Sequence, residues 1–170
     1  NKKFFTYDLL ISYGLFNKEI NNLKIAKNLF TISIKKYPLF IRPYLFLAEI
    51  LSLENSFKEA LRILFLAKEI EQNNSNVDYN LSILYKKNKL YNEALNYINK
   101  ALIISPKIEI YKILKADILI DNFQNQEAEQ ILGNLIFDKN SNLYFQKELL
   151  FSRIFINQKN YVEAENTLLK

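Results

Sequence analysis

Residues 76–106 place apolar and polar side chains with the period of two amphipathic helices. The apolar face of the first helix is formed by Leu81, Leu84 and Tyr85. The apolar face of the second is formed by Ala94, Ile98, Ala101 and Leu102. The polar residues 87–89 interrupt the pattern, and Pro106 ends it because proline cannot continue a helix. The stretch therefore predicts a hairpin of two antiparallel helices.

The same pattern occurs five times along the chain. Alanines recur every 34 residues, with a final interval of 36, at Ala26, Ala60, Ala94, Ala128 and Ala164, which we call the marker alanines. Twelve residues before each marker stands a small residue: Gly14, Ala48, Ser82, Ala116 and Ser152. Four residues after each marker stands a large apolar residue: Phe30, Leu64, Ile98, Leu132 and Leu168. All nine alanines occupy the marker, the position twelve before it or the position seven after it, so the repeat is not a chance pattern.

Small side chains at facing positions let two antiparallel helices approach closely, and one such pair buries its apolar face only by stacking on another. The sequence thus predicts an all-α protein, an α-solenoid of five antiparallel helix pairs. The expected helices cover residues 4–17, 21–36, 43–53, 57–72, 76–87, 91–104, 107–121, 125–136, 143–157 and 161–170. Residues 1–170 are expected to form a single repeat domain, with repeats at about 4–38, 41–72, 75–106, 107–138 and 142–170.

The third repeat resembles the signature of the tetratricopeptide repeat in Leu81-Ser82-x2-Tyr85, then Ala94-x3-Ile98, then Pro106. The resemblance covers nearly the whole chain. It implies a right-handed superhelix whose concave face is lined by the first helix of each pair, and ligand peptides usually lie along that face in the family.

Three features set limits on this resemblance. Asn17 stands where the family prefers an aromatic residue, so we expect a distorted first pair. Lys115 occupies a position that is apolar in the other repeats, so we expect looser packing in the fourth pair. The 34-residue step argues against a pentatricopeptide array, which has a 35-residue period and reads RNA bases.

The predicted partner-binding groove is an apolar strip along the first helices. Fifteen residues before the markers stand Ile11, Leu45, Tyr79, Ile113 and Leu149, and eleven before them stand Leu15, Glu49, Ile83, Asp117 and Arg153. The alternative is that these residues pack against the adjacent first helix, which applies above all to Ile11 and Leu149 at the ends. For Tyr79 and Ile83 in the middle we favour an interaction surface, because exposed apolar strips mark binding sites.

Composition narrows the possible functions. Histidine and cysteine are absent, and no glycine-rich phosphate loop or metal-ligand set occurs, so we expect no enzyme activity, cofactor, metal or small-molecule substrate. The net charge of +5 is weaker than that of a dedicated nucleic-acid binder. No run of about 18 apolar residues occurs, so no membrane span is expected. The absence of cysteine fits any compartment, with the cytoplasm favoured.

The ends of the chain lack the polar outer face that terminal repeats need. Leu168 and Leu169 are among the final residues, and no polar capping helix follows them. We therefore expect the native protein to continue beyond Lys170, and this chain to self-associate through its C-terminal end. The chain also lacks methionine and begins at Asn1, which is typical of a processed chain or of a piece of a longer one.

Three functions remain after this reasoning. The favoured one is a protein-protein interaction module that binds a peptide or helix of a partner in the apolar groove, as an adaptor, scaffold or chaperone-like protein. The second is a structural spacer or self-associating repeat. The third is weak nucleic-acid binding through the lysines at the turns.

Overall fold

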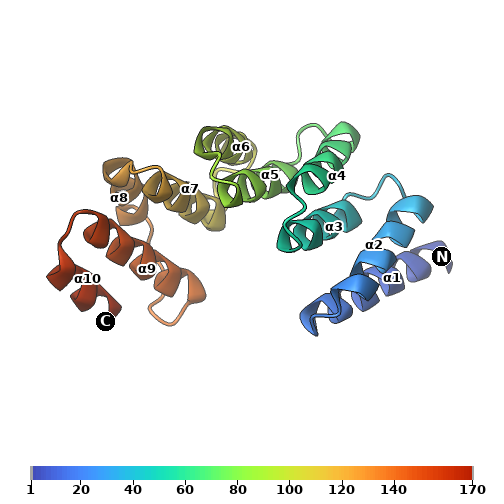
Figure 1. The fold of residues 1–170 in the computed structure, drawn as a ribbon, viewed down its shortest axis with the longest axis horizontal. Coiled ribbons are helices and arrows are strands. Elements are labelled where there is room, and N and C mark those ends of the chain that lie inside the picture. Colours follow the sequence, from blue (N-terminus) through green and yellow to red (C-terminus); the bar gives the residue numbers. More distant parts are fainter. Residues whose placement is uncertain (1, 170) are drawn as a thin grey trace. The chain divides into compact units, whose positions relative to one another are not determined.

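The computed structural model describes residues 2–169, and the side chains of residues 6–169. This part of the chain forms ten α-helices and no strand (Figure 1). They are α1 (Lys2–Glu19), α2 (Leu23–Lys36), α3 (Arg42–Leu53), α4 (Phe57–Ile70), α5 (Ser75–Lys87), α6 (Tyr91–Ile104), α7 (Glu109–Asp121), α8 (Asn125–Gly133), α9 (Asn142–Asn157) and α10 (Tyr161–Leu168). The predicted all-α fold of helix pairs is confirmed.

Most helix ends agree with the sequence pattern within two residues, and α8 is the main exception. It ends at Gly133, whereas the pattern predicts a helix to Ile136. That prediction is wrong because Gly133 and Asn134 are poor helix formers at the point where the apolar period weakens. The predicted last helix runs to Lys170, which lies outside the described residues.

One turn joins the two helices of every pair. Its central residue has a left-handed backbone with φ between 58° and 61° and stands five residues before the marker alanine, at Asn21, Asn55, Lys89, Phe123 and Lys159. The next N–H donates back to a carbonyl five residues earlier, as from Asn22 to Asn17 at 2.7 Å and from Gln124 to Leu119 at 2.8 Å. This bond closes a helix C-terminus by satisfying a carbonyl that the helix leaves unpaired.

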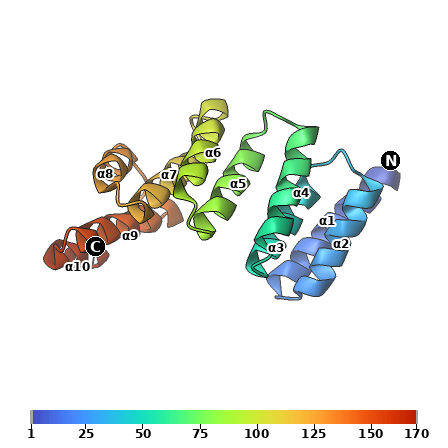
Figure 2. The same cartoon turned by 45° about the horizontal axis from the view of Figure 1, so that its top comes forward.

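The chain divides into two compact units, Asn1–Leu84 and Tyr85–Lys170. In the first unit α1 packs on α2, α2 on α3 and α3 on α4, and the views in Figures 1 and 2 show α1 and α2 side by side. Gly14 of α1 is required for this contact, since a Cβ there would lie 2.5 Å from Cε1 of Phe30 in α2. Phe30 is fully buried, so the small position of the first helix makes room for a large side chain of the second.

In the second unit the first helix of the fourth pair, α7, also packs on the first helix of the fifth pair, α9. The helix α7 contacts α6, α8 and α9, and α9 contacts α10. One apolar cluster comprises Ile113, Ala116, Leu119, Ile120, Ala128, Leu132, Leu135, Leu150 and Ile154. Because this cluster takes residues from α7, α8 and α9, it joins the fourth and fifth pairs into one core.

Candidate functional site

A surface hollow in the first unit lies between the second and third repeats. It has a volume of about 310 Å³ and is lined by Ala48, Glu49, Ser52, Leu64, Tyr79, Asn80, Ile83 and Leu84. These residues come from α3, α4 and α5, with both first helices contributing most of the wall. The structure thus brings together three of the predicted groove residues, Glu49, Tyr79 and Ile83.

Ion pairs on both sides of the hollow position its walls. Nζ of Lys68 in α4 lies 2.5 Å from Oδ1 of Asp78 in α5, and Asp78 is almost completely buried. Nζ of Lys18 in α1 lies 2.6 Å from Oε2 of Glu49 in α3. The first pair fixes α5 at the residue next to Tyr79, and the second fixes the carboxylate at the rim. The hollow is therefore held by contacts within its own unit.

The lining of the hollow is apolar with a few polar groups at its edge. Ala48 and Ser52 have short side chains, and Ile83 remains 37% exposed beside them. Nδ2 of Asn80 donates to the carbonyl of Asn76 at 2.7 Å, which fixes the orientation of the amide at the edge. Such a lining suits a peptide residue whose apolar side chain fills the hollow and whose backbone forms hydrogen bonds at its edge. A few fixed polar groups orient a ligand in an otherwise apolar site.

The remaining predicted groove residues do not form one continuous strip. Ile11 and Ile113 are only 3% and 5% exposed, so their side chains are packed inside the chain in this structure. Ile113 lies in the core cluster with Leu150 and Ile154 of α9, which is the packing that the alternative interpretation describes. Leu15 and Leu45 are half-buried. Leu149 is exposed on α9.

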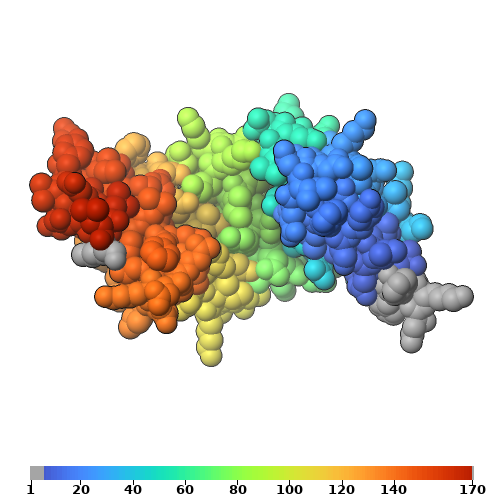
Figure 3. Space-filling model, turned by 90° about the horizontal axis from the view of Figure 1, so that it is seen from below, coloured from blue at the N-terminus to red at the C-terminus, as the bar shows by residue number. Residues whose placement is uncertain are grey.

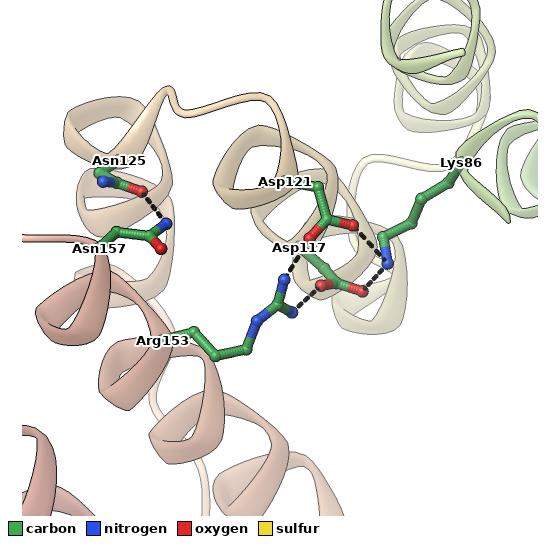
Figure 4. A network of polar contacts seen from close by, with 6 residues as sticks. All are labelled: Lys86, Asp117, Asp121, Asn125, Arg153 and Asn157. Carbon is green, nitrogen blue, oxygen red and sulfur yellow. Dashed lines mark hydrogen bonds and ion pairs between the residues drawn. The ribbon is translucent and has the colours of Figure 1, made fainter. Parts of the chain in front are cut away.

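Asp117 and Arg153, also predicted in the groove, belong to a charge network in the second unit (Figure 4). The guanidinium of Arg153 in α9 donates to Oδ1 of Asp117 and to Oδ1 of Asp121, both in α7. Nζ of Lys86 in α5 lies 2.9 Å from Oδ2 of Asp117 and 3.0 Å from Oδ2 of Asp121. Each carboxylate is thereby shared between two cations from neighbouring first helices.

The network favours the charged forms of its two cations. Burial alone would lower the pKa of Lys86, but the hydrogen bonds and negative charges of Asp117 and Asp121 outweigh it and raise that pKa. The same balance of burial against the two aspartates raises the pKa of the Arg153 guanidinium. All four side chains are between 22% and 34% exposed, so the network is partly shielded from water. The network links the first helices α5, α7 and α9 through hydrogen-bonded ion pairs.

Sequence reasoning missed Lys18, Lys86 and Asp121, although a signal for two of them exists. Lys18 and Glu49 are 31 residues apart, and so are Lys86 and Asp117. That spacing is one 34-residue repeat minus three residues, and side chains three apart share a helix face. Opposite charges at this spacing would have predicted both pairs. The acids expected at the groove edge are therefore held by basic residues of the chain itself.

Two predicted departures from the repeat pattern are accommodated by polar contacts. Asn17 is buried, and its Nδ2 donates to the carbonyl of Tyr13 at 2.8 Å within α1. Nζ of Lys115 in α7 lies 3.0 Å from Oε1 of Glu127 in α8. Both residues thus have partners inside their own helix pair.

A scan of the sequence against protein-family models and a search of the curated proteins both found no match. Solved structures do match. PilF of Pseudomonas aeruginosa superposes with a TM-score of 0.81 at 18% identity, over 98% of this chain and 75% of PilF. A tetratricopeptide repeat protein from Parabacteroides merdae superposes with a TM-score of 0.71 at 22% identity, over 95% of this chain. This chain has the tetratricopeptide-repeat fold.

A third tetratricopeptide-repeat protein, YrrB, is described as having an unusual peptide-binding site. It superposes with a TM-score of 0.63 at 14% identity, over 93% of this chain and 80% of YrrB. The present chain spans 64% of the length of the Parabacteroides protein. The resemblance inferred from the marker alanines is confirmed for the fold. No helix in the described residues is long and apolar enough to cross a membrane.

Proposed function

We propose that this chain is a protein-interaction module whose hollow between α3, α4 and α5 receives an apolar side chain of a partner peptide. The observation that carries the proposal is the hollow itself, which is open to solvent and walled by Tyr79 and Ile83 on one side and Ala48 on the other. Stacked repeats use surfaces of this kind for extended ligands. The peptide-binding site described for YrrB is consistent with it.

The chemistry of the lining defines the ligand. A volume of about 310 Å³ accommodates a side chain such as leucine or phenylalanine with part of its backbone. Glu49 is already paired with Lys18, so the hollow offers no unpaired carboxylate for a basic side chain. Asn80 and Ser52 lie where the ligand backbone can form hydrogen bonds. We therefore propose an extended peptide with one large apolar anchor residue.

Selection from a displayed peptide library, followed by calorimetry with the selected peptides, tests this proposal. Tyr79→Glu with Ile83→Glu should abolish binding, because two carboxylates would line the apolar site. The matched control is Ile103→Glu, on a residue of α6 that is 80% exposed and distant in sequence from the hollow. The proposed site would be refuted if the selected peptides lacked a large apolar residue, or if the double variant still bound them.

A second candidate is self-association through the C-terminal end, which the sequence also predicts. The helix α10 leaves Tyr161, Val162, Leu168 and Leu169 between 58% and 78% exposed. Such a surface would be covered if the ends of two copies met. Sedimentation of the chain with Leu168→Glu and Leu169→Glu tests this candidate. An unchanged association in that variant would exclude the C-terminal end as the contact.

A further inference from the structure

The helix α1 carries an exposed apolar stripe on the face opposite its contact with α2. The stripe consists of Leu9, Tyr13 and Phe16 of α1 and of Ile20, the first residue after the helix, whose N–H still donates to the carbonyl of Phe16 at 3.1 Å. These residues are 58%, 51%, 54% and 56% exposed. Ile11 and Gly14, on the inner face of the same helix, are buried. In the space-filling view the dark blue atoms of α1 lie at the surface of the first unit, beside the lighter blue and green atoms of the helices that follow (Figure 3). The helix α1 thus has apolar residues on both its inner and its outer face.

The spacing of the stripe is that of a helix-pairing seam. Its intervals are four, three and four residues, which keep the four side chains on one face of a helix. The order of the intervals is the same in both directions along α1. A two-fold contact requires a surface that is complementary to itself, and a seam with this order meets that requirement in an antiparallel pair. Leu9 of one copy then faces Ile20 of the other, and Tyr13 faces Phe16.

The charges beside the stripe favour the same orientation. Asp8 and Glu19 are exposed next to it, and the stripe itself carries no charge. A parallel pair would place Asp8 against Asp8 and Glu19 against Glu19, which is unfavourable for like charges. An antiparallel pair places Asp8 at the level of Asn21 and Glu19 at the level of Leu10. The antiparallel contact therefore brings no two acids together.

We infer that two copies of this chain associate through an antiparallel contact of their α1 stripes. With each large side chain taken as about 200 Å², the half-exposed stripe offers about 400 Å² per copy, or about 800 Å² for the pair. This area lies below that of a standard stable interface and suits a weak, reversible dimer, with flanking residues adding to it. The contact is separate from the proposed peptide hollow, so each can fail without the other.

Sedimentation equilibrium over a concentration series tests the inference. Tyr13→Glu with Phe16→Glu should raise the dimer dissociation constant at least about a hundredfold, because both central anchors become charged in a desolvated seam. The matched control is Ile103→Glu with Ile136→Glu, which places the same charges on two exposed apolar residues outside both candidate contacts. A chain that is monomeric at every concentration overturns the inference, and so does a dimer that dissociates only when glutamates are placed at the C-terminal end.

Disulfide trapping tests the orientation without disturbing the centre of the seam. The chain contains no cysteine, so an introduced cysteine is the only thiol in each copy. Leu9→Cys mixed with Ile20→Cys should give a covalent heterodimer under mild oxidation. Each variant alone should give none, because eleven residues separate the two positions by about 16 Å along the helix, beyond the reach of a disulfide. Crosslinking of either variant with itself, or none in the mixture, overturns the antiparallel contact.

Discussion

The turn at Phe123 offers a direct test of the backbone geometry shared by the five repeats. Phe123 has φ of 58° in the left-handed region, where a bulky side chain is strained, and its side chain is 82% exposed. The equivalent positions Asn21 and Asn55 carry asparagine, which tolerates this conformation. Phe123→Asn should therefore relieve strain while removing hardly any packing. The left-handed conformation costs a residue with a Cβ about 1–2 kcal/mol, and asparagine recovers part of it, so we expect a stabilisation of about 0.5–1 kcal/mol.

Urea unfolding followed by circular dichroism measures this change. In thermal unfolding of a chain of this size, a gain of about 1 kcal/mol corresponds to a rise of about 2–4 °C in Tm. The matched control is Ile136→Asn, since Ile136 is 90% exposed and is not among the residues with positive φ. The control separates relief of strain from the general effect of removing an exposed apolar residue. If Phe123→Asn destabilises the chain, or if both variants gain equally, strain at the left-handed turn is not the cause.

Three further predictions concern the core and the charge network. Ser33→Ala should raise the free energy of unfolding by about 1 kcal/mol in urea titration, because the buried Oγ of Ser33 has no hydrogen-bond partner among the described residues; an unchanged value would show that the hydroxyl is satisfied. Gly14→Ala should lower that free energy by about 1–3 kcal/mol through its clash with Phe30, whereas Gly133→Ala, with no neighbour within 4 Å, should not lower it. The free energy of unfolding should fall as pH rises above about 10.5, because the pKa of Lys86 is higher in the folded state than in the unfolded chain. Charged Lys86 therefore stabilises the fold fully below its ordinary pKa, and this stabilisation is lost as pH rises through the raised pKa. Lys86→Met should flatten this alkaline decline in a pH series of Tm values, and an equally steep decline would remove Lys86 as its cause.

The fold was predictable because its signal is local and repeated. The helical period locates each helix, and the marker alanines place the two helices of a pair against each other. Every described helix therefore overlaps one that the sequence predicts. The end of α8 was not predictable to the residue, since Ile136 continues the apolar pattern while Gly133 and Asn134 end the helix. A periodic pattern says less about helix ends than about helix centres.

The candidate site was predictable only in part because it depends on contacts between repeats. A position in the repeat selects one side of a first helix, but the neighbouring helix decides whether that side is covered. Ile113 is buried because α9 packs on α7, whereas Ile83 occupies an equivalent face and remains exposed. The extent of the domain and the ten groove residues as a set remain predictions. The proposed peptide-binding site is the hollow beside Tyr79.

The hollow lies where one ion pair of a repeating series is missing. A basic residue 31 positions before an acid joins neighbouring first helices at Lys18–Glu49 and at Lys86–Asp117. At the corresponding place in the hollow the two positions are held by Ser52 and Ile83, which cannot form an ion pair.

The absence of an ion pair between positions 52 and 83 explains why the surface there is open and apolar. Adding such a pair should close the hollow. Ser52→Lys with Ile83→Glu would install the missing pair on the same two helices. We expect that double variant to keep the wild-type helicity and Tm within a few degrees, because exposed ion pairs contribute only about 0–1 kcal/mol. We also expect it to lose peptide binding, measured by calorimetry with a peptide that binds the wild type. The charge-reversed variant, Ser52→Glu with Ile83→Lys, installs the same pair in the opposite sense and should lose peptide binding as well. If the first double variant binds the peptide as tightly as the wild type, the opening between α3 and α5 is not the binding site.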